Sequence, residues 1–553
     1  MHYNLAQQVN RERIGSISDV LAKNVIKGVV NDGANFTNWK EIDPESQMPA
    51  GYNQEVIVRL TDADFDITQI NETFITMTVH STIKLSDLIY STIENDIGPE
   101  FQKAMFLFVG LKNSSDILHD YTIYHKGLTI SNSLQNDATI ESALYHTVES
   151  KASKNNKKHV HSLYTSIHEY DTSAAGVYIS LYDLRNIASS NREYTIDIPV
   201  NIPITDILPF QAFTEYPNNL FGELKIKFRI NPNAFVFAMV DPTHSTHKYF
   251  FSHGFSSSID ATEKAEILAL TNAIPKMNEY DRGFFQFGTT GRMGYLKFET
   301  PNYSIDSKPL SISMINYTIT KCSTVIRGYK MEKNAFEIER QKYSVEPFTV
   351  PGQRIDISTF PQSATSTALK TSQNIALHFV TDFMVYFPKY PQQITCWENP
   401  MIQNLQLNTC GNNYPERAVS TIDPAFIQMQ LQAADLSTFN LEATEEFENS
   451  LTIARANDTQ RLRANTDLTS FVATFPVERS SGVGLYFDGL DTKGQNVSVE
   501  LRGNPIYQGA NDTYYDPVGD GSVRPPPPVL AMVQDTFWIF NAKNSGTCTY
   551  EIN

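Results

Sequence analysis

Strict alternation of apolar and polar residues marks several short segments of the chain. In one segment, five residues fall on one side with threonine, serine, histidine and lysine between them: Ile75, Met77, Val79, Ile83 and Leu85. The segment LKIKFRI repeats the pattern with Leu224, Ile226, Phe228 and Ile230, which alternate with Lys225, Lys227 and Arg229. Successive side chains of a strand point to opposite faces. Both segments are therefore predicted to be strands with one buried and one solvated face.

Other segments carry apolar residues on both faces. They are residues 375–387 (IALHFVTDFMVYF) and residues 537–540 (FWIF) near the C-terminus. Strands of this kind are covered on both sides. Many short strands separated by turn residues predict antiparallel β-sandwiches, and the fold class is therefore all-β.

Four segments have a helical pattern, and all lie between or before runs of predicted strands. They are residues 17–30, 139–151, 261–274 and 444–462. The two sheets of a sandwich already cover each other's apolar faces. Inserted helices are therefore expected in the loops at its ends.

The N-terminal helical segment is a candidate assembly contact. Four of its apolar residues lie near one helical face: Ile17, Val20, Leu21 and Val25. Such a face can dock on a partner, but a terminal helix that packs on its own domain explains the pattern equally well.

A chain of 553 residues is too long for one hydrophobic core, because single cores stop growing at about 250–300 residues. Residues 231–292 mix loop signals with a helical pattern and separate two strand-rich halves. We predict an N-terminal arm with a short helix (1–45), a first sandwich (46–250), a connector (251–290) and a second sandwich (291–553).

Charge and cysteine content narrow the classes of function. The 44 basic and 61 acidic residues give a net charge of -17, which disfavours bulk nucleic-acid binding. The four cysteines show no zinc-site spacing and are too few for dependence on disulfides. Neither a signal peptide nor a membrane span is evident, and we expect synthesis in the cytosol.

Candidate chemistry is sparse. No phosphate loop, zinc helix, nucleophile elbow or dinucleotide fingerprint occurs. Asp62, Asp64 and Asp66 have the spacing of one strand face and could hold a hard cation, but they lack the glycine of a calcium loop. A solvated strand edge is the commoner case.

Three histidines of the predicted connector are a second candidate metal site: His244, His247 and His253. Their segment has the composition of a flexible loop, and no pattern of supporting residues accompanies them. We therefore predict no catalytic residues, no metal, no cofactor and no small-molecule substrate.

Residues 200–232 (VNIPITDILPFQAFTEYPNNLFGELKIKFRINP) resemble the end of the first jelly roll of double-jelly-roll viral major capsid proteins. In that family a strand ends in a proline–aromatic corner, here Pro209 and Phe210. A loop and a turn, here near Gly222, then lead into an alternating closing strand.

Three segments of the second half resemble the same family. Residues 310–343 (LSISMINYTITKCSTVIRGYKMEKNAFEIERQKY) resemble the entry into the second jelly roll, and residues 396–415 (CWENPMIQNLQLNTCGNNYP) resemble a strand with a glycine turn and a Tyr-Pro exit. Residues 471–506 (FVATFPVERSSGVGLYFDGLDTKGQNVSVELRGNPI) are most similar to Polinton/Maverick, adintovirus and virophage-type capsid proteins.

The resemblance implies two antiparallel jelly-roll sandwiches in one chain, a double jelly roll with a few short helices in loops. It implies a structural protein of the virion that forms homotrimers of pseudo-hexameric outline in an icosahedral shell of a double-stranded DNA virus or virus-like element. Penton and minor capsid proteins are then the expected partners besides further copies of the chain.

Two alternatives stay open from the sequence alone. A scaffold protein of the same fold differs only in leaving the particle before maturation. A carbohydrate-active β-sandwich protein would use paired carboxylates, which carry no short motif.

Overall fold

The computed structural model describes most of the strand-rich parts of the chain. These are residues 34–51, 54–85, 99–111, 113–132, 160, 176–186, 193–210, 213–231, 235–239, 248–250, 252–255, 257, 259–273, 286–287, 293–300, 303–360, 369–386, 402–420, 423–426, 473–478, 488–505, 528–541 and 547–551. Within them, no helix combines the length and apolar character needed to span a bilayer.

In the described residues the second sandwich has nine strands, and the order of the first eight defines the fold. They are β15 (Phe348–Thr359), β16 (Leu369–Ala376), β17 (Val380–Tyr386), β18 (Ile402–Thr409), β19 (Asn412–Val419), β20 (Ala473–Pro476), β21 (Asn496–Pro505) and β22 (Val529–Asn541). One sheet has the order β15-β22-β17-β20 and the other β16-β21-β18-β19. Lettered B to I along the chain, these are the B-I-D-G and C-H-E-F sheets of a jelly roll. A further strand, β23 (Thr547–Glu551), pairs with β22.

The first sandwich contains three of the same antiparallel pairs. Its strands are β1 (Ala34–Ile42), β2 (Ala50–Gly51), β3 (Val56–Arg59), β4 (Ile67–Leu85), β5 (Phe106–Leu111), β6 (Leu118–His125), β7 (Leu128–Asn132), β8 (Gly176–Ser180), β9 (Glu193–Pro203), β10 (Leu224–Ile230), β11 (Phe235–Met239), β12 (Gln286–Phe287), β13 (Met293–Thr300) and β14 (Tyr303–Met331). The sheet β3-β10-β6-β7 faces the sheet β1-β14-β4-β9, and β12-β11-β5-β8 form a further sheet. With β3, β4, β6, β9 and β10 as B, C, D, H and I, the pairs B-I, I-D and C-H recur.

Strand pairing corrects part of the predicted domain division. The sequence assigns residues 291–553 to the second sandwich and residues 1–45 to an arm. However, β14 is hydrogen-bonded to β4 from Ile312 to Tyr329, and β1 pairs with the opposite edge of β14. Residues 303–331 therefore extend a sheet of the first sandwich, and the chain passes to the second sandwich at β15.

Helices connect and cap the strands, as predicted. The helices of the described residues include α3 (Pro99–Ala104), α7 (Leu181–Asn186), α8 (Asn218–Phe221), α10 (Ala261–Ala273) and α11 (Lys333–Val345), with 3-10 turns η1 (Ser114–Ile117), η2 (Ile204–Asp206) and η3 (Leu208–Phe210). The helix predicted over 261–274 is confirmed by α10. Those predicted over 17–30, 139–151 and 444–462 lie outside the described residues.

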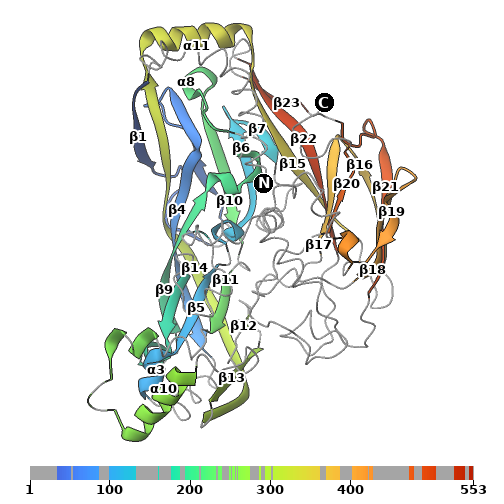
Figure 1. Ribbon diagram of the computed structural model, residues 1–553. Coiled ribbons are helices and arrows are strands. Elements are labelled where there is room, and N and C mark those ends of the chain that lie inside the picture. Colours follow the sequence, from blue (N-terminus) through green and yellow to red (C-terminus); the bar gives the residue numbers. More distant parts are fainter. Residues whose placement is uncertain are drawn as a thin grey trace.

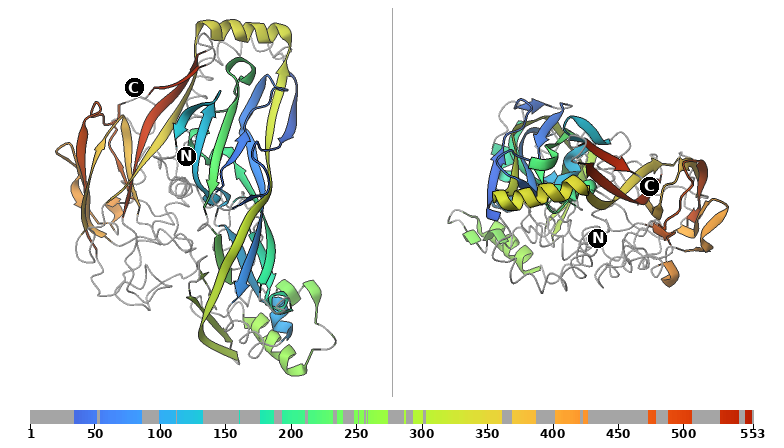
Figure 2. Two further views of the ribbon diagram at one scale, coloured as in Figure 1. Left: turned by 180° about the vertical axis from the view of Figure 1, so that it is seen from behind. Right: turned by 90° about the horizontal axis from the view of Figure 1, so that it is seen from above.

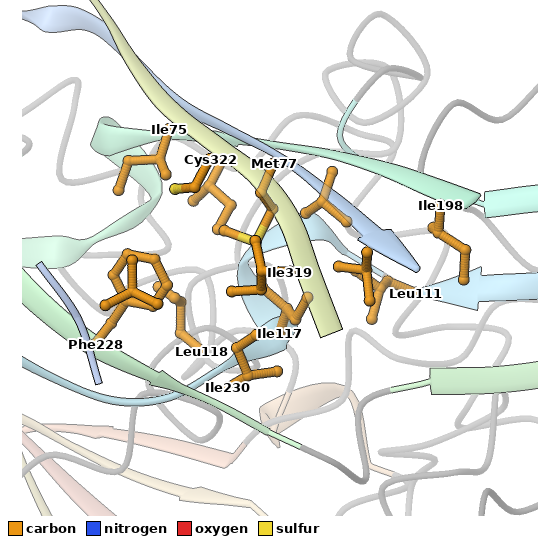
Figure 3. Packing of buried hydrophobic residues seen from close by; sticks show 14 of the residues in the cluster. Ile75, Met77, Leu111, Ile117, Leu118, Ile198, Phe228, Ile230, Ile319 and Cys322 are labelled. Atoms are coloured by element: carbon orange, nitrogen blue, oxygen red, sulfur yellow. The ribbon is translucent and has the colours of Figure 1, made fainter. Parts of the chain in front are cut away.

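Burial follows the predicted alternation. The apolar residues of LKIKFRI are buried in β10, whereas Lys225 and Lys227 are half-buried and Arg229 is exposed. In β4, Ile75, Met77, Val79 and Ile83 are likewise buried. These side chains meet between the two sheets in one continuous cluster (Figure 3).

The two sandwiches stand side by side and touch along one end (Figures 1 and 2). There α11 crosses the end of the first sandwich, between the end of β14 and the start of β15. From this end, β15 and β22 run together into the second sandwich. The connection between the sandwiches is thus an extended pair of strands, not a loop.

Candidate functional site: the junction between the sandwiches

The strands β15 and β22 extend beyond the core of their own sandwich. Phe348 lies opposite Phe540 in this pair, and Val350 lies opposite Trp538. Val350, Trp538 and Phe540 are buried in the core of the first sandwich, and Phe348 packs against it. The two sandwiches therefore share a core at this point, which we call the junction.

The first sandwich contributes the loop that follows β9. Phe210, at the end of η3, and Phe213 and Tyr216 beyond it are almost completely buried. The ring of Phe213 meets that of Trp538 at 5.0 Å in an edge-to-face arrangement, and Tyr216 meets Phe540 in the same way at 5.4 Å. Such pairs each add about 0.5–1.5 kcal/mol beyond the burial of their area.

A buried asparagine fixes this loop to β4. The side-chain amide of Asn218 donates to the carbonyl oxygens of Asp62 and Phe65 at 2.8 Å, and its oxygen accepts from the Thr68 hydroxyl at 3.1 Å. The backbones of Thr68 and Tyr216 also exchange two hydrogen bonds, of 2.8 and 2.9 Å. Buried polar groups with such partners hold a unique geometry, so the aromatic loop is held rigidly.

Gly222 ends α8 and turns the chain into β10. Its φ of 97° is in a region that residues with a Cβ rarely adopt, and a Cβ would lie 2.1 Å from Cε of Lys126. The Tyr216 hydroxyl donates to the Gly222 carbonyl at 3.0 Å. The turn thus requires glycine and places Phe221 in the junction.

Helix α11 packs against the junction through Tyr343. Tyr343 lies with its ring 5.3 Å from that of Phe221 and 5.6 Å from that of Phe348. Burial, together with the carboxylates of Glu339 and Glu215, raises the pKa of Tyr343 to about 12. The hydroxyl is therefore neutral at physiological pH, and the ring joins residues of both sandwiches.

The three aspartates of the sequence DADFD are engaged by protein groups. Lys40 on β1 donates to Asp62 at 2.9 Å and also to Asp64. Asp66 accepts from the backbone of Met331 at 2.9 Å and from Asn219 at 2.7 Å. The three aspartate side chains thus link their own loop to β1, to the end of β14 and to α8. In the described part of the chain, no three His, Cys, Asp or Glu residues gather as metal ligands would.

Among the other sequence candidates, the structure describes His253. His253 is exposed, stacks on Tyr249 and contacts its carbonyl at 3.0 Å. His244 and His247 lie outside the described residues, as do the assembly candidates Ile17, Val20, Leu21 and Val25.

Sequence reasoning missed most of the junction. It found the corner at Pro209 and Phe210 and the turn at Gly222 through a resemblance, and it predicted that residues 537–540 are covered on both sides. It did not show that Trp538 and Phe540 cross to the other sandwich. Contacts between residues more than 300 positions apart leave no local periodicity in the sequence. The one signal for the junction is the run of aromatic residues in the loop after β9.

Comparisons with known proteins found matches among solved structures. No protein-family model and no curated protein matches the chain. Matching solved structures include a chain of the Sputnik virophage, 9% identical, covering 94% of this chain and 89% of that chain with a TM-score of 0.45. The mavirus major capsid protein is 11% identical, with coverages of 93% and 90% and a TM-score of 0.45. The Faustovirus major capsid protein is 6% identical, with coverages of 91% and 90% and a TM-score of 0.43.

Such proteins are of the kind that the sequence resembles. The strand order of the second sandwich and the recurring pairs of the first establish an antiparallel double jelly roll.

Proposed function

We propose that the chain is a major capsid protein, a structural subunit of an icosahedral double-stranded DNA virus or virus-like element. The observation that supports this most is the junction, where two jelly rolls share one buried core. Jelly rolls are a recurrent fold of viral shells. A shell subunit must be rigid before it is tiled, and a shared core provides that rigidity where a flexible linker would not.

Three copies of such a subunit give a block with six similar edges. Closed three-fold symmetry then produces a pseudo-hexameric outline, and one sequence can tile a near-hexagonal lattice. We propose this homotrimer as the building block, with lateral contacts to further trimers and to penton and minor capsid proteins. The net charge of -17 is consistent with a shell that does not itself bind nucleic acid in bulk.

The proposal is tested on the purified full chain by light scattering after size exclusion and by negative-stain imaging. We expect a stable trimer whose contacts bury more than the ~1,600 Å² of a standard interface. Added salt screens charge over about 10 Å, so larger shells should form more readily as ionic strength rises. A monodisperse monomer at every salt concentration would overturn the proposal.

A second measurement separates a capsid subunit from a transient scaffold. Mature particles from infected or expressing host cells are purified and their protein content is determined by mass spectrometry. We propose that the chain is made in the host cytoplasm and persists in the virion. Its loss from mature particles would assign it to scaffolding instead.

A further inference from the structure

A histidine with no role in the packing described so far lies inside the junction. His125 is the last residue of β6, and its side chain is completely buried. Its ring stands nearly perpendicular to that of Phe540, with the centroids 5.2 Å apart. A residue of the first sandwich that can titrate thus contacts a strand of the second.

The hydrogen bonds of His125 fix the neutral form of its ring. Nε2 lies 2.8 Å from the carbonyl oxygen of Phe221. A carbonyl oxygen only accepts, so Nε2 carries the proton and Nδ1 is the unprotonated nitrogen. Within the described part of the chain, the buried Nδ1 atom has no hydrogen-bond partner. A second proton on this ring would therefore have no acceptor unless water enters the junction.

Charged groups around His125 do not favour its protonated form. Burial lowers the pKa of His125 below its ordinary 6.5, the hydrogen bond to Phe221 raises it, and the charge of Lys126 lowers it. Two charged residues on the neighbouring turn and β10, Glu223 and Lys225, pair with each other at 3.0 Å.

The other elements packed on the ring add little charge. The strand β7, which pairs with His125, has the sequence LTISN and carries no charged residue. In β22, Asp535 is the charged residue and lies five positions from Phe540. Beyond Phe221, α11 contributes Glu339, whose pKa burial raises, and Lys342.

We propose that His125 makes the junction an acid-sensitive latch, closed around the neutral ring and loosened when the ring is protonated. Protonation places a charge and a second donor next to the Phe540 ring. Water can satisfy them only if β6 and the end of β22 separate. The second sandwich then loosens from the first while the core of each sandwich remains packed.

The direction of the pH effect follows from linkage. A lowered pKa in the folded protein means that the stabilising contribution is complete above the ordinary value and is lost as the pH falls through the lowered one. Between the two pKa values, the opening constant of the junction rises by up to about tenfold for each unit by which the pH falls.

The test is hydrogen–deuterium exchange of the full chain at about pH 7.5 and about pH 5, the range in which histidine titrates. Rates are corrected for the intrinsic effect of pH. We expect segments 537–541 and 213–221 to lose protection at the lower pH, with little change in β18 and β21. His125→Gln keeps a donor toward Phe221 but does not titrate, so its junction should be equally protected at both pH values.

The matched control is His119→Gln, which removes an exposed histidine of the same strand and should behave as the wild type. His125→Asn serves as a second neutral variant if the glutamine variant does not fold. Equal protection of the wild-type junction at both pH values would overturn the latch. So would a wild-type pH response in the neutral variant. Neither result bears on whether the chain forms trimers, so the latch and the proposed function fail separately.

Discussion

The two ends of β22 serve different cores. Near its start, Leu530 and Met532 are buried in the core of the second sandwich. Near its end, Trp538 and Phe540 are buried among residues of the first sandwich. A single strand therefore contributes to the cores of both sandwiches, and its middle must separate them.

The middle of β22 is polar although it is buried. Gln534, Asp535 and Thr536 are each at most 2% exposed. The Gln534 amide donates to Asp356 on β15 at 2.8 Å, and Asp382 on β17 is also fully buried. Buried polar side chains need partners in fixed places, so the hydrogen bond from Gln534 in this polar belt helps to fix the register of β22 against β15.

The difference between the apolar ends of β22 and its polar middle explains how two sandwiches can be rigidly joined and still keep separate cores. The belt keeps the junction distinct from the core of the second sandwich, while the continuous strand transmits rigidity between them. Since a slip of one residue would exchange the faces of the strand, both clusters depend on the same register. Because the belt separates the junction from the core of the second sandwich, loss of the junction should leave that sandwich packed.

The largest expected effect tests this separation on one strand. Trp538→Ala should cost about 3–5 kcal/mol of unfolding free energy, because it removes a large buried side chain. Hydrogen exchange should increase in segment 213–221 and at the end of β22. Leu530→Ala is the matched change, and it should cost about 2–5 kcal/mol but loosen β17 and β18. If both variants loosened the same segments, the two ends would belong to one core.

A smaller effect is expected where the loop of the first sandwich turns into β10. Gly222→Ala should cost about 1–3 kcal/mol, since it strains the backbone and displaces Lys126. Gly127→Ala is its control, because Gly127 has a φ of 80° but open space around a Cβ. Chemical denaturation should rank Gly222→Ala as the more destabilising variant. An equal loss would mean that only the backbone, and not the packing beside the junction, matters here.

Strands with one solvated face could be predicted well from the sequence. The alternation in β4 and β10 is confirmed because one side of each faces the core and the other faces water or an ion pair. Lys227, for instance, stays half-buried through its 3.0 Å contact with Glu55. The charged ends of such side chains remain near the surface, while their carbon chains cover the sheet.

A turn that is itself apolar was not predicted. The sequence of residues 375–387 predicts strand residues covered on both faces, and residues 380–385 of β17 are buried on both faces, but β16 ends at Ala376 and β17 begins at Val380. The turn between them contains a buried Leu377 and a Phe379 with a positive φ of 43°. No glycine or proline marks it, so the residues lack the usual turn signal.

The junction was beyond prediction for a different reason. The aromatic residues of segment 210–221 indicate burial, but they do not indicate the partner. Likewise, β14 was expected in the second sandwich because it follows the connector, although its partner is β4. Long-range pairing depends on the whole chain, whereas alternation reports only which face of one strand is covered.

The smallest effect is expected at the ion pairs between Lys40 and the aspartates of the loop that joins β3 to β4. Burial raises the pKa of Asp62, but hydrogen bonds from Lys40 and the Asp64 backbone outweigh it, so the pKa is lowered from 3.8. The contribution of the ion pairs to stability is therefore present above pH 3.8 and is lost as the pH falls through the lowered pKa of Asp62.

Asp62→Asn combined with Asp64→Asn should cost only about 0.2–1 kcal/mol at neutral pH, because the pairs are partly exposed. Denaturation curves at several pH values measure this cost, and elemental analysis checks whether the wild type holds a metal that the variant lacks. A bound metal, or a loss of trimers in the variant, would show that these carboxylates do more than pair with Lys40. An unchanged particle would leave rigidity at the junction as the stronger determinant of the subunit's shape.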